Sequence, residues 1–291
     1  MDIKIIRRIL ALLILLLGGN SEAQLRGDSE PRQITMLKSQ ALAGEIPAQF
    51  NLAMAYQFGE GVDRNLEEAL RWYLKAAESG HDQSQFNLAF LLLQARHDEQ
   101  AFYWFRQSAE QGLAVAQRGL SLVYAEGRGV RLNNRLFTRW NRKAADRGLV
   151  DAQFDMGVAY DLGIGVRKNL KKAVFWWTHA AEQGHANAQF NLGVSFEYGE
   201  GVAIYIDEAI KWYLLAAQHG HPEAQINLGS AYANGSGVNQ DFVIAYIWLE
   251  LAADQGLKQA RENLLIIGNR MTETDIGKAN QLAHQIVIAN Q

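Results

Sequence analysis

A tryptophan returns along this chain at a nearly constant interval. Six of the seven tryptophans are spaced by 32, 36, 36, 36 and 36 residues, and a glycine lies eight residues after each of them. These tryptophans are Trp72, Trp104, Trp140, Trp176, Trp212 and Trp248. An active site needs its special residues once, whereas a stack of equivalent units needs them in every copy. The interval therefore predicts a repeat protein.

The first half of each repeat is predicted to be an amphipathic helix. Leu52, Ala53 and Tyr56 place apolar side chains at helical spacing in the first copy. A small residue recurs at one position of this helix, where it lets a neighbouring helix approach closely: Ala53, Ala89, Ser121, Gly157, Gly193 and Gly229. A Gly-x-Gly-Val turn then ends the helix, because glycine adopts positive φ at little steric cost.

The second half of each repeat is predicted to be a helix that begins at a side-chain cap. Favoured N-cap residues share one position, occupied by Asn65, Asn133, Asn169 and Asp241. Tyr205 takes this position in repeat five, so we expect that cap to move to Asp207. The six tryptophans and the Ala-Ala pairs that follow are expected to be buried. Because one helix pair cannot bury its faces alone, neighbouring pairs must stack.

Repeat two is shorter than the others. It has 32 residues, lacks the Gly-x-Gly-Val turn and carries LLLQARHDEQAF in its place. We expect its two helices to meet through a tight turn, with Asp98 as the cap.

Partial repeats are expected at both ends of the array. Residues 33–44 resemble a lone second helix without its tryptophan, and residues 272–288 resemble a final helix. Thr272 is the expected N-cap of that final helix. The side chains expected to face inward from it are Ile276, Leu282 and Ile286.

The N-terminus has the layout of a secretory signal peptide, which we assign to residues 1–23. Lys4, Arg7 and Arg8 precede an apolar run over residues 9–17, and small residues follow at 21–23. That run is shorter than the about 20 residues of a membrane span, so we expect cleavage and no integral span afterwards; an uncleaved anchor is the alternative. We expect export to the periplasm, with secretion as the alternative. The chain has no cysteine, so its stability must come from packing rather than disulfides.

The repeat pattern A-x-x-x-[LM]-[GA]-x-x-Y-x-x-G-x-G-V … A-x-x-W-[YW]-x-x-A-A-x-x-G-H resembles the Sel1-like repeat family, relatives of tetratricopeptide repeats. Repeat four carries it in full, at Ala152, Met156, Gly157, Tyr160, Gly163, Gly165 and Val166, then Ala173, Trp176, Trp177, Ala180, Ala181, Gly184 and His185. The resemblance implies an all-α fold, a right-handed α-α superhelical solenoid of helix pairs. Its expected repeats are 48–83, 84–115, 116–151, 152–187, 188–223 and 224–259, between a segment with a capping helix at 24–47 and capping helices at 260–291.

The same resemblance implies a function. Members of the family are mainly scaffolds for protein complexes, and many bacterial members act in the cell envelope or are secreted. We therefore expect a non-catalytic interaction scaffold or adaptor of the envelope with a protein or peptide ligand. The alternatives are an enzyme acting on cell-wall or β-lactam substrates and a secreted host-interaction factor.

Motifs for catalysis, metal binding and cofactor binding are absent from the sequence. It contains no Ser-x-x-Lys, Gly-x-Ser-x-Gly, His-Glu-x-x-His or phosphate-cradling Gly-x-x-x-x-Gly-Lys. We therefore expect no catalytic residues and no cofactor. His81, His185 and His221 share one position just past the helix-ending glycine, each in a different repeat. They are interpreted as turn residues rather than metal ligands.

A partner groove is the favoured candidate site. By analogy with tetratricopeptide repeats, the first helices line the concave side. Their groove-facing positions hold Phe50, Met54, Phe58, Phe86, Phe90, Phe154, Val158, Leu162, Phe190, Val194 and Tyr198. Exposed apolar strips mark partner sites, and a helix or extended peptide fits one. For Phe50, Phe86, Phe154 and Phe190 the alternative is packing between adjacent first helices.

A basic patch is the second candidate. Residues 116–151 hold eight basic and three acidic side chains, although the whole chain carries a net charge of -3. The patch comprises Arg128, Arg131, Arg135, Arg139 and Arg142. It is interpreted either as a solvated face paired with acids of a neighbouring repeat or as a site for an acidic protein or an anionic polysaccharide. Nucleic acid is not expected as a partner of an exported protein.

Overall fold

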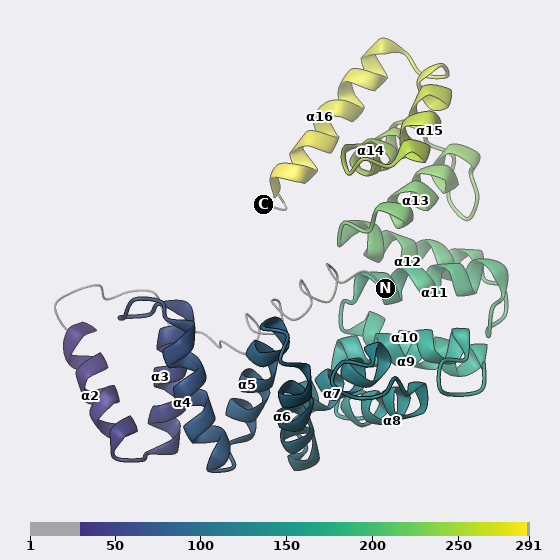
Figure 1. The fold of residues 1–291 in the computed structure, drawn as a ribbon. Helices are drawn as coiled ribbons and strands as arrows, with labels where there is room; N and C mark the ends of the chain where they lie inside the picture. The colour runs from purple at the N-terminus through teal and green to yellow at the C-terminus, as the bar shows by residue number, and fades with distance from the viewer. Residues whose placement is uncertain (1–29, 290–291) are drawn as a thin grey trace. The chain divides into compact units, whose positions relative to one another are not determined.

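The computed structural model describes residues 30–289, which form helices joined by short turns (Figure 1). The predicted signal peptide lies outside these residues. The first helices along the chain are α2 (Glu30–Leu42), α3 (Ile46–Phe58), α4 (Leu66–Glu78), α5 (Asp82–Gln94), α6 (Asp98–Gln111), α7 (Ala114–Glu126) and α8 (Asn134–Ala145). They are followed by α9 (Val150–Leu162), α10 (Leu170–Glu182), α11 (Ala186–Tyr198), α12 (Ile206–Gln218), α13 (Pro222–Asn234), α14 (Phe242–Asp254), α15 (Lys258–Gly268) and α16 (Glu273–Ala289). Over this range, no helix has both the length and the apolar character needed to cross a bilayer.

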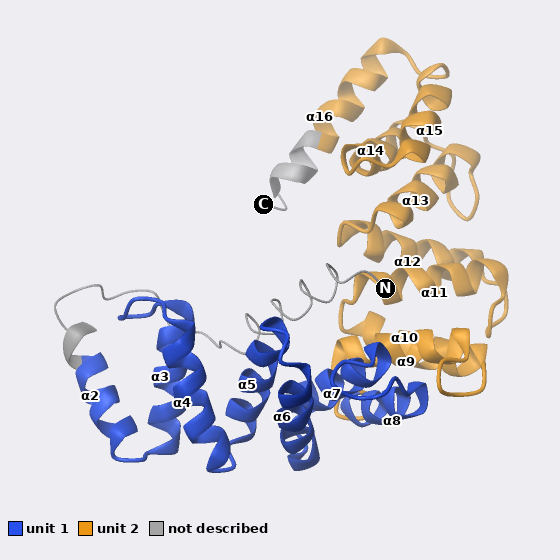
Figure 2. Ribbon diagram, in the orientation of Figure 1, with its two compact units in different colours: residues 1–144 blue, residues 145–291 orange. Residues whose placement is uncertain are grey.

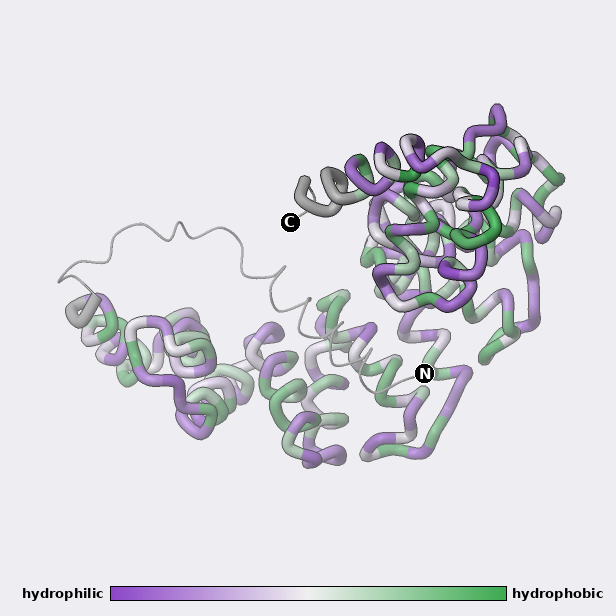
Figure 3. The backbone as a smooth tube through the Cα atoms, turned by 90° about the horizontal axis from the view of Figure 1, so that it is seen from above, coloured by the Kyte–Doolittle hydropathy of each residue, from purple (hydrophilic) through white to green (hydrophobic). Residues whose placement is uncertain are grey.

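The chain divides into two compact units, residues 1–144 and 145–291 (Figure 2). In unit 1 each helix from α2 to α6 packs against the next one along the chain. The same holds in unit 2 from α9 to α14, and α14 also packs against α15 and α16. Apolar and polar residues alternate along the helices of both units (Figure 3), as expected when each helix buries one face. The predicted all-α solenoid of stacked helix pairs is confirmed.

The glycine turns and the polar caps form as predicted. Gly59, Gly163 and Gly199 end their helices in the left-handed conformation, with φ of 78°, 74° and 74°. Asn65 accepts hydrogen bonds from the backbone N–H groups of Glu67 and Glu68. The same cap recurs at the other predicted positions, which are Asn133, Asn169 and Asp241.

Two predicted cap shifts are wrong. In repeat five, Tyr205 itself occupies the N-cap position of α12 without a side-chain cap, and Asp207 lies inside the first turn. In repeat two, His97 is the N-cap of α6, and Asp98 is the first helical residue. Asp98 instead accepts a hydrogen bond from Arg128. Neither helix needs the shift, because stacking fixes its starting point regardless of the cap.

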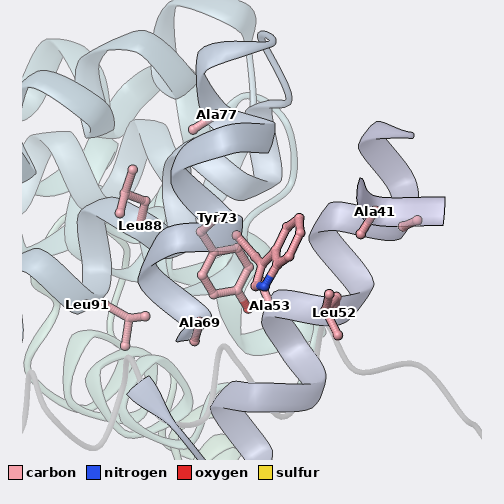
Figure 4. Packing of buried hydrophobic residues seen from close by; sticks show 10 residues of the cluster. Ala41, Leu52, Ala53, Ala69, Tyr73, Ala77, Leu88 and Leu91 are labelled. Atoms are coloured by element: carbon pink, nitrogen blue, oxygen red, sulfur yellow. The ribbon is translucent and has the colours of Figure 1, made fainter. Parts of the chain in front are cut away.

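In repeats one, two, five and six, the residue that follows the tryptophan is more buried than the tryptophan itself. Tyr73, Phe105 and Leu249 are fully buried, and Tyr213 is nearly so. Figure 4 shows Tyr73 in the cluster that includes Ala53 and Leu88. Of the six periodic tryptophans, Trp72 and Trp176 are buried. The prediction of burial is wrong for the half-buried ones, which are Trp104, Trp140, Trp212 and Trp248.

The small residues of the first helices make room for these buried rings. A Cβ atom on Gly157 would lie 2.2 Å from the indole of Trp177, and one on Gly193 would lie 2.4 Å from the ring of Tyr213. Both separations are too short for two carbon atoms. The predicted close approach of neighbouring helices is therefore confirmed in unit 2.

A buried glutamine ties each repeat to the preceding helix. In repeat five, Gln189 donates from Nε2 to the carbonyl of Ala181, at the end of α10. The same contact, eight residues back along the chain, recurs for Gln49, Gln85, Gln117, Gln153 and Gln225. Each of these carbonyls also accepts from the backbone N–H of the glycine three residues later, so the glutamine adds a second, side-chain donor at the end of the helix. This glutamine recurs at one position of all six repeats, yet it was not among the positions predicted to be structural.

The ends of the array agree only in part with expectation. Thr272 caps α16 as predicted, accepting a hydrogen bond from the backbone N–H of Asp275. Leu282 was expected to face inward and is instead exposed, while Ala279 and Ala283 are the buried residues of this helix. Small side chains on α16 let it lie close to α14. The side chain of Ile286 is outside the part of the molecule that the structure describes.

Candidate partner-binding surfaces

The recurring histidines are structural caps. His81, His185 and His221 precede α5, α11 and α13, and each Nδ1 accepts a hydrogen bond from a backbone N–H three residues later. Burial lowers the pKa of His81 and of His221, opposed by the nearby carboxylates Asp82 and Glu223. A neutral ring is what this role requires, because a protonated Nδ1 cannot accept. No metal-binding cluster of His, Asp or Glu occurs within the described residues.

The phenylalanines expected in the groove pack against those caps. Phe154 stacks on His185 with ring centroids 4.4 Å apart, and Phe50 lies 5.0 Å from His81. Phe86 packs edge-on against Phe105 inside repeat two. Phe50 and Phe154 thus pack against the start of the next first helix, which is the packing alternative left open for this position, whereas Phe86 packs within its own repeat.

The remaining groove positions differ strongly in exposure. Phe86 and Phe90 are 2% and 5% exposed, so their assignment to an open groove is wrong. Phe86 packs against Phe105 of α6, in the repeat whose two helices are joined by the short connection 95–97. The half-buried members are Phe50, Met54, Phe154, Val158, Phe190 and Val194. The accessible ones lie at the ends of first helices: Phe58 in unit 1 and Leu162 and Tyr198 in unit 2, exposed by 45%, 63% and 66%.

Repeat five extends its exposed apolar surface beyond the helix end. Ile204 and Tyr205, in the turn between α11 and α12, are 62% and 59% exposed. A Cβ on Gly199 would lie 2.9 Å from Cγ1 of Ile204, which places this side chain on the turn beside Tyr198. We call Tyr198, Ile204 and Tyr205 the repeat-five patch. Acidic side chains of the same repeat accompany it, namely Glu197, Glu200, Asp207 and Glu208.

The basic patch divides into internal and exposed parts. Arg128 donates to the carbonyl of Leu93 at 2.7 Å and pairs with Asp98, so it links the turn after α7 to the turn between α5 and α6. Its assignment to a partner site is wrong, because its guanidinium is engaged within unit 1. Burial raises the pKa of Glu126 next to this pair, with Arg128 opposing that shift. The exposed arginines are Arg131, Arg135, Arg139 and Arg142.

Comparison with known proteins resolves what the repeats are. A sequence model of the Sel1 repeat matches residues 46–81, 82–113, 114–149, 150–185, 186–221 and 222–257. The chain belongs to the Sel1 repeat family. The family expected from the repeat pattern is therefore confirmed. Each matched repeat begins two residues before the bound that was expected from the sequence. Sel1 repeat proteins are generally non-enzymatic protein-interaction scaffolds.

Two solved Sel1 repeat structures resemble this one. The c5321 protein of uropathogenic Escherichia coli strains, described as a protective antigen with an SLR fold, is 32% identical with a TM-score of 0.79. The match covers 89% of this chain and 56% of that one, so this chain spans little more than half of its relative's length. A Sel1 repeat protein from Oxalobacter formigenes is 34% identical with a TM-score of 0.73, over 80% of this chain and 68% of that one.

Repeat two, which lacks the Gly-x-Gly-Val turn, lies beside a cleft that the sequence did not predict. The cleft has a volume of about 490 Å³ and is lined by α4, α5 and α6 of unit 1. Its lining residues are Leu70, Arg71, Leu74, Leu88, Leu92, Glu99, Gln100, Tyr103 and Trp104. The only hint in the sequence is the missing turn of repeat two.

Proposed function

We propose that this Sel1 repeat protein is a non-catalytic scaffold of the bacterial cell envelope that binds a segment of a partner protein. The contacts are made in unit 2 by the exposed apolar ends of first helices, Leu162 and Tyr198, and Phe58 of unit 1 is a separate candidate contact. The repeat-five patch is the strongest of them. The scaffold role of the family supports the class of function.

The observation that carries the proposal is the residue at the N-cap of α12. In repeats one and four, Asn65 and Asn169 cap the second helix and are polar. In repeat five, Tyr205 makes no cap hydrogen bond and leaves 59% of its side chain exposed. Losing a cap costs about 1 kcal/mol of stability. Because Tyr205 stabilises neither the helix nor the core, contact with another molecule is the explanation we propose for a tyrosine at this position.

The chemistry around the patch defines its partner. Two tyrosines and an isoleucine offer flat apolar area with hydroxyl groups at the edges, which suits a peptide with aliphatic or aromatic side chains. Glu200 and Asp207 are exposed in the same repeat. Glu208 already pairs with Lys211 at 2.5 Å. A partner segment that combines apolar and basic residues fits this arrangement.

A separate role is proposed for the exposed arginines of repeat three. Arg131, Arg135 and Arg139 orient an acidic region of the partner, or an anionic polysaccharide, by long-range attraction. Changing all three to glutamine should lower the association rate and its salt dependence while the dissociation rate changes little. An unchanged association rate would remove this part of the proposal.

We propose that residues 1–23 direct export of the scaffold to the periplasm. Cell fractionation tests this directly, since a periplasmic protein is released by osmotic shock and lacks the N-terminal residues in mass spectrometry. Recovery of the full-length chain from the cytoplasm would contradict it.

A second candidate function is favoured by one comparison. The likeness to a protective antigen of uropathogenic E. coli supports a secreted factor that meets a host protein. Recovery of the protein from culture supernatant, with little in the periplasm, would favour this candidate over the envelope scaffold.

Site-specific crosslinking tests the binding surface. A photo-reactive phenylalanine analogue is placed at position 205, and in a control at Phe175, which is 54% exposed on the second helix α10. We expect one discrete adduct from position 205 in living cells and none from 175, and we expect Tyr198→Ser to abolish it. Equal adducts from both positions, or none from 205, would refute the assignment.

A further inference from the structure

The second glycine of each Gly-x-Gly-Val turn packs on the preceding repeat. A Cβ on Gly237 would lie 2.6 Å from Cγ2 of Ile206 and 3.1 Å from Cγ1 of Ile210, both on α12. A Cβ on Gly201 would lie 2.5 Å from the backbone of Leu170 at the start of α10. The turn of one repeat therefore covers the first turns of the preceding second helix, and only glycine fits at the point of contact.

Repeat two cannot supply this cover to α4. Residues 95–97 connect α5 to α6, whereas residues 59–65 connect α3 to α4 in repeat one. The short connection forces Arg96 to a φ of 66°, a conformation that costs a non-glycine residue energy. Leu66 and Leu70 of α4 correspond to Ile206 and Ile210 of α12. Repeat two, all of whose residues are described, has no Gly-x-Gly-Val turn to cover them. Leu66 and Ile206 are similarly exposed, at 41% and 37%, so the difference between the two repeats lies in the missing turn and in the cleft that is lined by Leu70 and Leu74.

The cleft lies beside the position of the missing turn. Leu70 and Leu74 of α4 form one wall, and Leu88 and Leu92 of α5 line it as well. Across from them, Tyr103 and Trp104 of α6 pack edge to face with centroids 5.0 Å apart. Only two of the lining residues are charged, Arg71 and Glu99, and Arg71 already pairs with Glu68 at 2.6 Å. Concave apolar sites with few polar groups are typical of binding sites.

We propose that the cleft binds a partner polypeptide segment that takes the place of the missing turn. The segment carries two small residues separated by one residue and followed by a branched aliphatic residue, the chemistry that covers α12 within this chain. The small residue nearest α4 permits close approach, and the aliphatic residue enters the space between Leu74 and Tyr103. This site is distinct from the repeat-five patch, which lies in unit 2, so either can fail alone.

Two features favour a chain segment as the occupant. The same molecule shows that polypeptide covers equivalent positions elsewhere in the described residues: Gly61 lies on Ile34, Gly129 on Asp98, Gly201 on Leu170 and Gly237 on Ile206. The missing part is also a defined length of chain, since repeat two is four residues shorter than its neighbours, at 32 against 36. Structures that lack one element are completed in a similar way when a partner adds a strand to a sheet.

The test uses a peptide from this chain that is known to cover isoleucines. The probe is Ala233–Asp241, sequence ANGSGVNQD, and the control peptide carries Gly237→Val. Isothermal titration and NMR shifts should show binding of the probe to the full chain with a Kd below about 1 mM, the weak end of specific recognition. The control peptide should bind at least tenfold more weakly, because its valine Cβ cannot approach α4.

Variants of the protein place the binding in the cleft. Leu74→Lys should abolish it, whereas Leu215→Lys, at a position of similar exposure on α12 (39% against 38%), should not. In a graft, GSGVNQD replaces residues 95–97, so that repeat two gains its own turn. The graft should raise the melting temperature of the protein and abolish its binding of the probe peptide. A control graft with valine at its second glycine should leave both the melting temperature and the binding unchanged.

Several results would overturn the proposal. They are absence of probe binding at 2 mM peptide, equal binding of the two peptides, and equal binding by the wild type and the graft. Binding of a small apolar dye in the cleft without any binding of the probe would also overturn it, because the occupant would then be a small molecule.

Discussion

The ring of Phe190 lies flat on the imidazole of His221, with centroids 4.4 Å apart and planes 16° from parallel. Phe190 belongs to the first helix of repeat five, and His221 precedes the first helix of repeat six. The stack holds the imidazole so that its Nδ1 accepts from the N–H of Ala224. One contact therefore joins two repeats and caps a helix.

The histidine caps predict that stability falls at mildly acidic pH. Burial holds the pKa of His81 and of His221 below the ordinary value of 6.5. Below that value the unfolded chain binds protons that the folded chain resists, so the free energy of unfolding decreases as pH falls. The full contribution is present above the ordinary pKa. We expect thermal unfolding to show a lower Tm at pH 5.5 than at pH 7.5.

A double variant separates these caps from other titrating groups. His81→Asn with His221→Asn keeps a favoured N-cap residue that does not titrate in this range, so its Tm should change less between the two pH values. His97→Asn is the control, because His97 is exposed and makes no side-chain cap bond. If the double variant and the control show the same pH dependence as the wild type, the histidine caps do not cause it.

The small residue in each first helix predicts a strong size limit. Gly193→Ala should lower the free energy of unfolding by about 1–3 kcal/mol, because its Cβ would overlap the buried ring of Tyr213. Gly277→Ala is the matched control in α16, where a Cβ would meet nothing within 4 Å. It should stabilise the protein by about 0.5–1 kcal/mol through helix propensity. Urea unfolding measures both, and equal effects of the two variants would contradict the packing described for Gly193.

The glutamine contacts predict a difference between two equivalent positions. Gln189 donates to Ala181, and its Oε1 lies 2.8 Å from His219 Nδ1 in the same unit. Gln49 makes only the first kind of bond, to Ala41, and its buried Oε1 has no partner among the described residues. Gln189→Met should cost about 1–3 kcal/mol, because it removes the acceptor that faces His219 Nδ1 and one of the two donors to the Ala181 carbonyl. Gln49→Met should cost less, and an equal or larger loss for Gln49→Met in urea unfolding would contradict this account.

The helices and their turns could be predicted because each depends on local chemistry. The φ of 74° at Gly163 and the cap at Asn169 follow from residue types at fixed spacing. Burial at a given repeat position could be predicted less well. The tryptophan is the more distinctive residue, yet Tyr73 and Tyr213 are more buried than Trp104 and Trp212, because helix packing decides which of two adjacent side chains points at the next helix.

The site could be predicted only in part because its exposure depends on neighbouring repeats. Phe58, Leu162 and Tyr198 are accessible as expected, because each is the last residue of its helix and no further helical turn follows to cover it. Phe90 follows the same period and is buried, because the short repeat two changes its surroundings. For Arg128 the interpretation as an ion pair with a neighbouring repeat holds, but the identity of its partner Asp98, 30 residues away in the preceding repeat, could not be predicted. Periodicity within one repeat does not contain such contacts.

The substitution Tyr205→Asn tests the central claim most directly. Asparagine restores the cap that Asn169 provides in repeat four, so the free energy of unfolding should rise by about 0.5–2 kcal/mol. The measurement is the yield of the adduct from a photo-reactive group at position 198, compared between the wild type and Tyr205→Asn in living cells. The account predicts a more stable protein whose adduct falls at least fivefold. A more stable protein with an undiminished adduct would show that Tyr205 is not kept for binding.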